Sequence, residues 1–160
     1  MKNTQERGEI VFSEERPRTE TNVVRVLDSL ACRPNLVLLA ERLPAPDGLR
    51  SWTRLLCTDD FDAWLIAWGA SSEVGVHDHG DSRGGIRVLL GSLLEEYRES
   101  PSARWRRRAI RPGQSVEIPP TRIHNVSNPA SRNAVSLHVY SPPLQQMNFF
   151  PEAEQLEVSV

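Results

Sequence analysis

Cysteine is scarce in this sequence, and its scarcity excludes several classes of protein. Only Cys32 and Cys57 occur in 160 residues, too few for a disulfide framework. We therefore expect both to be reduced, buried, apolar residues of a cytoplasmic protein. No apolar run approaches the roughly 18 residues that a membrane helix needs. The N-terminal stretch also lacks the apolar centre of a secretory signal, so neither export nor a membrane partner is expected.

An excess of charge of one sign is missing as well. The formal net charge is −2, and the apolar and charged fractions, 39% and 25%, are ordinary for a globular protein. This balance argues against a nucleic-acid partner held mainly by phosphate contacts. Repeats and low-complexity segments are absent too, and the length favours one domain. We expect a monomer.

The chain divides into a polar tail, a helical part and a β part. Residues 1–20 form the polar tail, and residues 21–160 are expected to form a single domain. Apolar residues at three- and four-residue spacings predict helices within 21–44, the first capped by Thr21 or Asn22 and the second following Pro34. A cluster of proline and glycine at 44–48 ends this part.

The β part is expected at 50–160. Short runs rich in β-branched, leucine and aromatic residues alternate there with turn signals, which predicts an all-β barrel or sandwich. The pattern also predicts a tight hairpin at Gly91 and a type II turn at 111–114. The expected strands lie near 51–57, 62–68, 74–79, 85–90, 92–98, 103–110, 114–118, 122–127 and 134–140, with further ones at 145–150 and 155–159.

Four histidines occur, all in the β part. His77 and His79 are two apart, so on a strand both rings point to one face, where their Nε2 atoms can meet a metal. Two surface histidines on a polar loop are the alternative. His124 follows a turn, a strand and a second turn, and a hairpin of this kind can return its ring to the first pair. The three residues are therefore candidate metal ligands.

These histidines lie in two stretches that resemble the sequence motifs of the cupin superfamily. The first motif reads Gly-x5-His-x-His-x3,4-Glu-x6-Gly; the chain has both histidines and Gly91, but Ser71 replaces the first glycine and the glutamate is missing. The second motif is matched with one replacement, Thr121, at Gly113, Pro119, His124 and Asn128. The resemblance implies a mainly β fold, a small cupin barrel (double-stranded β-helix or jelly roll) with short N-terminal helices.

The missing glutamate bears on the chemistry of the implied site. Three neutral imidazoles leave a divalent metal with its full +2 charge, which favours an anionic ligand such as a thiolate. A three-histidine set also suits zinc, so the ligands alone do not select iron.

Ser136, His138 and Tyr140 share one face of the strand expected at 134–140. They are candidates for a hydrogen-bonded relay, and a purely structural polar network is the alternative. A serine hydrolase is not expected, because the Gly-x-Ser-x-Gly elbow is absent.

Together, these stretches resemble the cysteine dioxygenase family, bacterial type. The similarity lies in the strand Ser136-x-His138-x-Tyr140 with the Ser-Pro-Pro after it, in the run at 77–82, and in the Trp-Thr-Arg ending at Arg54. It implies one Fe(II) per chain on His77, His79 and His124, and a small-molecule thiol and O2 as partners. Arg54 would bind the substrate carboxylate. Tyr140, oriented by His138 and Ser136, would act near the sulfur.

The implied reaction is the oxidation of L-cysteine by O2 to cysteine sulfinic acid, with both oxygen atoms ending on sulfur. Animal members of the family have a cysteine that crosslinks to this tyrosine. Gly84 occupies that position here, so Tyr140 is expected to be a free phenol. No organic cofactor is implied.

Three alternatives stay open. Some family members carry glutamine at the position of Arg54 and prefer mercapto-acids without an amine, such as 3-mercaptopropionate. A metal-dependent cupin isomerase would usually keep the missing glutamate, and a sensor domain would need neither Arg54 nor the polar strand face. Arg54 has an ordinary alternative too, as a solvated surface charge. Trp64 and Trp68 are expected in the core.

Overall fold

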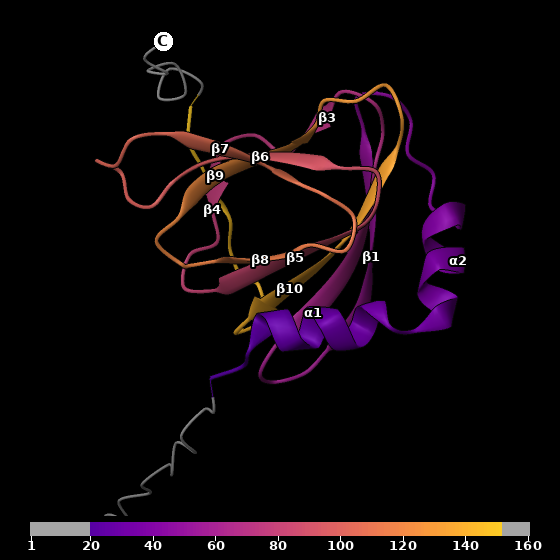
Figure 1. The fold of residues 1–160 in the computed structure, drawn as a ribbon. Coiled ribbons are helices and arrows are strands. Elements are labelled where there is room, and N and C mark those ends of the chain that lie inside the picture. The colour runs from indigo at the N-terminus through magenta and orange to yellow at the C-terminus, as the bar shows by residue number, and fades with distance from the viewer. Residues whose placement is uncertain (1–19, 152–160) are drawn as a thin grey trace, which may run out of the picture.

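A computed structural model describes residues 20–151 of the chain, and the structural statements that follow concern that range. Two antiparallel β-sheets face each other as a barrel, and two helices lie outside one of them (Figure 1). The mainly β fold with short N-terminal helices is therefore confirmed. The expected tail at 1–20, all but its last residue, and the expected strand at 155–159 lie outside the described residues.

Both helices begin where the sequence signals place them. Helix α1 spans Val23–Ala31, and the side chain of Asn22 caps it by accepting a 3.0 Å hydrogen bond from the backbone N–H of Arg25. Helix α2 spans Pro34–Arg42, with its proline in the first turn, where a missing N–H costs nothing. Helix α1 packs on strands β5, β8 and β10 of the first sheet, which Figure 1 shows along its lower face.

The strands form two sheets, of order β1-β2-β10-β5-β8 and β11-β4-β9-β6-β7, with β3 pairing β9. Strand β10 is the centre of the first sheet and β9 the centre of the second. The strands are β1 (Arg50–Cys57), β2 (Asp62–Trp68), β3 (Ser72–Glu73), β4 (His77–Asp78), β5 (Arg83–Leu90), β6 (Leu93–Arg98), β7 (Arg106–Ile110), β8 (Ser115–Ile118), β9 (Ile123–Asn128), β10 (Ala134–Ser141) and β11 (Asn148–Phe149).

Strand β10 is buried on both faces; one face is apolar and packs against the helices, and the other is polar and faces the barrel interior. Val135, Leu137 and Val139 point outward into an apolar cluster with α1 and α2, which covers this side of the sheet. Ser136, His138 and Tyr140 point into the barrel. A second apolar cluster between the sheets, which includes Trp68, supports the interior beside them. The helices thus pack against the outer face of the strand that carries the polar line.

Most expected strands match, and the differences have local causes. The strand expected at 74–79 is two short ones, β3 and β4, separated by residues 74–76. Before them, Ser71 has a φ of 58°. This is the position that the cupin motif fills with glycine, the residue for which that conformation costs least. The turn at 111–114 is closed by a 3.0 Å bond from Gln114 N to Arg111 O, with Gly113 at a φ of 81°.

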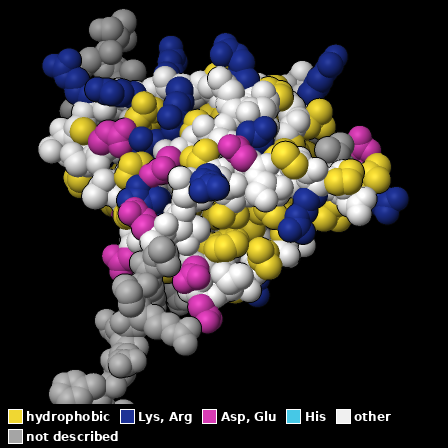
Figure 2. Space-filling model, turned by 60° about the horizontal axis from the view of Figure 1, so that its bottom comes forward, with side chains coloured by type: hydrophobic (Ala, Val, Ile, Leu, Met, Phe, Trp, Pro, Cys, Tyr) yellow, Lys and Arg dark blue, Asp and Glu magenta, His cyan; other side chains and the backbone are white. Residues whose placement is uncertain are grey.

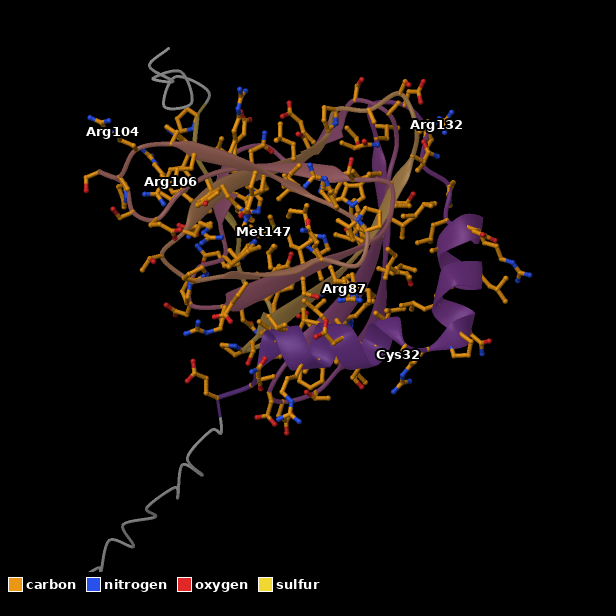
Figure 3. All side chains as sticks on the ribbon, in the orientation of Figure 1. Cys32, Arg87, Arg104, Arg106, Arg132 and Met147 are labelled. Carbon is orange, nitrogen blue, oxygen red and sulfur yellow. The ribbon has the colours of Figure 1, made fainter. Side chains whose placement is uncertain are left out.

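The expectation that both cysteines are buried is wrong. Cys32 and Cys57 are exposed, and each lies at the end of a secondary-structure element. Cys32 lies at the turn between α1 and α2 (Figure 3), and Cys57 ends the edge strand β1. Neither cysteine lines the cavity beside the histidines described below.

The surface on the side of helix α1 mixes hydrophobic, basic and acidic side chains, and no histidine is in view there (Figure 2). All four histidines are buried. Among residues 20–151, neither helix is long and apolar enough to cross a membrane.

Candidate metal centre and cavity

Three histidine rings converge inside the barrel, as their spacing predicts. His77 lies on β4 and pairs in register with His124 on β9, and His79 follows β4 directly. The Nε2 atom of His79 lies 3.2 Å from that of His77 and 3.2 Å from that of His124. Three nitrogen atoms that can bind a metal, from β4, the residue after it and the adjacent strand β9, therefore meet at one point.

The spacing and protonation of the three rings fit a metal ion. Histidine nitrogens lie about 2.0–2.1 Å from a first-row ion, so ligands at right angles are separated by about 3 Å. Burial lowers the pKa of His77 to about 4 and that of His79 to about 2, and it holds the pKa of His124 well below its usual range. The rings are therefore neutral near pH 7, with lone pairs available for coordination.

Two of the three rings are oriented by partners at their other nitrogen. Nδ1–H of His77 donates to the carbonyl oxygen of Gly75 at 2.8 Å, and Nδ1–H of His124 donates to Oε1 of Glu95 at 2.9 Å. These bonds leave each Nε2 as the free acceptor that a metal requires. Nδ1 of His79 is buried and has no hydrogen-bond partner within the described part of the chain.

Glu95 is a site residue that sequence reasoning missed. Its fully buried carboxylate accepts a 2.6 Å bond from Arg108 Nε and lies 3.5 Å from Arg122 Nη1, so two arginines stabilise its charge. A signal for it exists: Leu93, Glu95 and Tyr97 alternate on β6, so a buried Leu93 places Glu95 on the inward face. The motif glutamate is missing, but a carboxylate lies behind His124.

The polar line on β10 is a continuous hydrogen-bonded chain, and a tryptophan sets its direction. Trp68 Nε1 donates to Ser136 Oγ at 2.8 Å, and Ser136 Oγ lies 2.8 Å from His138 Nε2. The buried serine hydroxyl has no other acceptor among the described residues, so it donates to Nε2. Nδ1 of His138 then carries the proton and donates to the Tyr140 oxygen at 3.2 Å.

This direction leaves the Tyr140 hydroxyl hydrogen free to donate into the cavity. Burial, and then the charge of Asp62, raise the pKa of Tyr140, so the phenol keeps its proton. Its ring meets the ring of His79 edge-on, with centroids 4.8 Å apart. Gly84 is the register partner of Tyr140 on β5, so no sulfur faces the phenol from that position.

A cavity of about 350 Å³ opens beside the three histidines. Its wall is mostly apolar and aromatic, and among the described lining residues Arg50 is the only arginine and no carboxylate occurs. The lining residues are Arg50, Trp52, Trp64, Ile66, Val74, His77, His79, His124, Val126, His138, Tyr140, Leu144, Met147 and Phe149.

The set of residues that line the cavity differs from the set expected from the sequence. Arg54 does not line the cavity: its side chain is exposed, and its guanidinium lies 5.4 Å from the Trp64 ring centroid. Its substrate-binding role stays a prediction. Trp68 is a core residue as expected, whereas Trp64 forms part of the cavity wall. Trp52 begins the Trp-Thr-Arg stretch named from the sequence, but no place in the cavity was predicted for it. Sequence reasoning missed Arg50 and the wall contributed by 144–149, where no motif signals a site.

Comparison with known proteins places this site in a family. The family model described as "Cysteine dioxygenase type I" matches residues 47–153. Cysteine dioxygenase type 1 of Danio rerio is 31% identical over 103 residues, 58% of this chain and 50% of that protein. The protein of the same name from Rattus norvegicus is 30% identical over 102 residues, with the same coverage. The chain thus spans about half the length of these curated relatives.

Solved structures show the fold independently. An uncharacterised conserved protein with a double-stranded β-helix domain from Klebsiella pneumoniae superposes with a TM-score of 0.56 at 16% identity. The match covers 69% of this chain and 92% of that one. The cupin fold is therefore confirmed, and the expectation of a bacterial-type member remains a prediction.

Glu95→Gln should weaken the binding of divalent metal about 10- to 100-fold, because the amide orients and polarises His124 less than a carboxylate does. Alanine at His77, His79 or His124 removes a ligand and should abolish most binding. Metal titration of the metal-free protein measures both effects. Glu96→Gln, on the opposite face of β6, is the matched control. Wild-type affinity in Glu95→Gln would contradict the role assigned to the carboxylate.

The metal-free protein should lose stability as the pH falls below about 6.5. Burial lowers the pKa of His138 to about 3, so between these values the unfolded chain binds a proton that the folded chain does not. Each such histidine contributes a slope of about 1.4 kcal/mol per pH unit to the free energy of unfolding. Urea unfolding between about pH 7 and pH 5 measures the slope. An unchanged slope in His138→Gln would mean that His138 is protonated when folded.

Proposed function

Because the chain belongs to the cysteine dioxygenase type I family, we propose that it is an iron-dependent thiol dioxygenase that converts L-cysteine and O2 into cysteine sulfinic acid. The overall change is RSH + O2 → RSO2H, in which sulfur is oxidised and both oxygen atoms end on it. The cytoplasmic location and the monomeric state stay predictions from the sequence.

One observation carries the proposal: the directed relay on β10 ends in a phenol beside three converging imidazoles. A barrel that only held a structural metal would need no hydrogen-bond donor aimed into a cavity. The pairing of a metal centre with a positioned proton donor fits a reaction in which charge develops on atoms next to the metal.

The donor set fits iron as it fits other first-row ions, and His77, His79 and His124 would hold it. Bound there, Fe(II) would supply a +2 centre that brings a thiolate and O2 together and exchanges electrons with them. The neutral ligands preserve that charge, which favours the thiolate over the thiol.

The chain's own residues bind and orient the substrate. Tyr140 donates a hydrogen bond to the anionic sulfur or oxygen, and His138 fixes the direction of that bond. The apolar side chains of the wall exclude water, which strengthens each polar contact inside. A guanidinium is the natural partner for the substrate carboxylate. Arg54 has that role in the family pattern, and its role here remains a prediction.

A second candidate substrate is 3-mercaptopropionate, and one observation favours it. No carboxylate lines the cavity within the described part of the chain, so the wall offers no counter-ion to the ammonium of L-cysteine. A thiol that carries a carboxylate and lacks the amine meets the same wall without that cost.

The iron-loaded protein should consume one molecule of O2 for each molecule of L-cysteine or 3-mercaptopropionate that it oxidises. The product should be the corresponding sulfinate. Mass spectrometry of the product made under isotopically labelled O2 should find both labelled oxygens on sulfur. No O2 uptake with either thiol would contradict the proposal and would favour a cupin isomerase or a sensor domain. Protein that carries zinc instead of iron is the control.

Tyr140→Phe should lower turnover by about 10²- to 10⁴-fold if the phenol transfers a proton, while the metal stays bound. The metal should stay because no ligand is changed. Oxygen uptake and metal content, measured on the same sample, separate the two effects. Unchanged turnover would contradict the role of the relay. Peptide mapping should find Tyr140 without a crosslink, and a loss of two hydrogens on its peptide would contradict that expectation.

A further inference from the structure

We propose that Arg50, rather than Arg54, binds the carboxylate of the thiol substrate in this protein. The inference rests on the proposed function for the thiol part of the substrate. The anion site itself follows from the geometry of the cavity wall.

Arg50 enters the cavity, and two indoles hold its guanidinium there. It begins strand β1 and lines the wall together with the three histidines and Tyr140. The guanidinium carbon lies 5.5 Å from the centroid of Trp68 and 6.0 Å from that of Trp52. Cation–π contacts at these distances stabilise the positive charge and limit the directions in which the group can point.

No acidic side chain among residues 20–151 forms an ion pair with Arg50. Within residues 20–151 its side chain has neither a hydrogen bond nor an ion pair, whereas the side chains of Arg83, Arg87, Arg108 and Arg122 are each paired with an acidic side chain. Burial lowers the pKa of Arg50, because the charged group loses water to an apolar wall. A half-buried guanidinium with unused donors is a receptor for an anion, and a carboxylate matches its geometry with two parallel bonds.

The charge of Arg50 acts on the residues of the site, and the charge of Arg54 does not. After burial, the positive charge of Arg50 contributes to the lowered pKa of His77 and of His138, and it acts on Tyr140 in the direction opposite to burial. Arg54 acts instead on Asp62, where it opposes the rise in pKa that burial causes. Since Arg50 lines the same cavity as the three histidines and Tyr140, an anion bound to Arg50 lies next to the metal centre and the phenol.

The register of strands β1 and β2 explains why Arg50 lines the cavity and Arg54 does not. Arg50, Trp52 and Arg54 alternate on one face of β1, and Arg54 is paired with Trp64 on β2. The large indole of Trp64 forms the wall at that level, and Arg54 lies against it on the exposed side. Four residues before Arg54 on the same strand, Arg50 is opposite Trp68, whose ring is buried in the core. The long Arg50 side chain therefore has room to reach the cavity.

This assignment defines the substrate class. The cavity takes a thiol with a carboxylate, and none of its described lining residues is an acid that could recognise an ammonium. Cysteamine, which has the amine but no carboxylate, should be a poor substrate whatever residue is at position 50. L-Cysteine and 3-mercaptopropionate should both depend on Arg50.

The test compares Arg50→Gln with Arg54→Gln in the full chain, with Arg106→Gln as the matched control. Arg106 lies on β7 and is not among the residues that line the cavity. Binding of propionate and of 3-mercaptopropionate to the metal-free protein is followed by tryptophan fluorescence, because Trp52 and Trp68 flank the guanidinium. KM and kcat of the iron-loaded enzyme are then measured for both thiol acids and for cysteamine.

Arg50→Gln should weaken binding of both carboxylates about 10- to 100-fold, as expected for a lost charged hydrogen bond. Arg54→Gln should weaken carboxylate binding less than about threefold, as expected for the loss of a solvent-exposed charge. KM should rise in Arg50→Gln for the two thiol acids and stay the same for cysteamine. Arg50→Lys, which keeps the charge without the planar fork, should give an intermediate affinity and serves if the glutamine variant does not fold.

Wild-type affinity in Arg50→Gln or Arg50→Lys, or an equal or larger loss in Arg54→Gln, would overturn the proposal. Failure of the proposed function has a different signature. Carboxylate binding would then still depend on Arg50 in the metal-free protein, but no thiol would consume O2 in the iron-loaded one.

Discussion

The barrel interior must hold four uncharged imidazoles, and this requirement shapes much of the structure around them. A buried polar atom without a partner costs about 1–3 kcal/mol, so nearly every ring nitrogen needs a specific neighbour. Gly75, Glu95, Ser136 and Tyr140 supply those neighbours, and each selects one tautomer. Burial keeps the rings neutral, and the tautomers turn the Nε2 atoms of His77 and His124 toward one point. Nδ1 of His79 is the exception within the described residues.

The apolar packing that supports this centre lies on the opposite side of the sheet. Strand β10 carries the relay on its inner face, while its outer face packs against α1 and α2. The close approach of α1 depends on Gly85, because a Cβ at that position would lie 2.9 Å from the Leu27 side chain. The helices contribute no residue to the cavity, yet they hold in place the strand on which the phenol and its orienting histidine lie.

Charge is separated across the centre. Glu95, a buried carboxylate, is paired with the ring of His124 on the side away from the other two metal ligands, and Arg108 and Arg122 lie around it. The cavity side has Arg50 and no described acid. A metal at the three histidines would therefore have negative charge behind one ligand and positive charge beside the substrate. This polarity suits an anionic thiol acid, with its thiolate toward the metal and its carboxylate toward a guanidinium.

Local spacing alone predicted a large part of this protein. Two histidines two residues apart share a strand face, and alternation places Ser136, His138 and Tyr140 on another, because the side-chain period of a strand is two. The limits of β2 and the start of both helices follow from equally local signals. Contacts between strands distant in sequence decided the rest. Glu95 reaches His124 because β6 pairs with β9. Arg50 reaches the cavity because it is opposite Trp68, whereas Arg54 is opposite Trp64, whose indole forms the cavity wall there. The exposure of Cys32 and Cys57 depends on which surfaces the neighbouring elements cover. The position of a long, flexible side chain depends on the space around it and on the charges near it. Both are set by neighbours that are distant in sequence, and only the tertiary structure determines those neighbours.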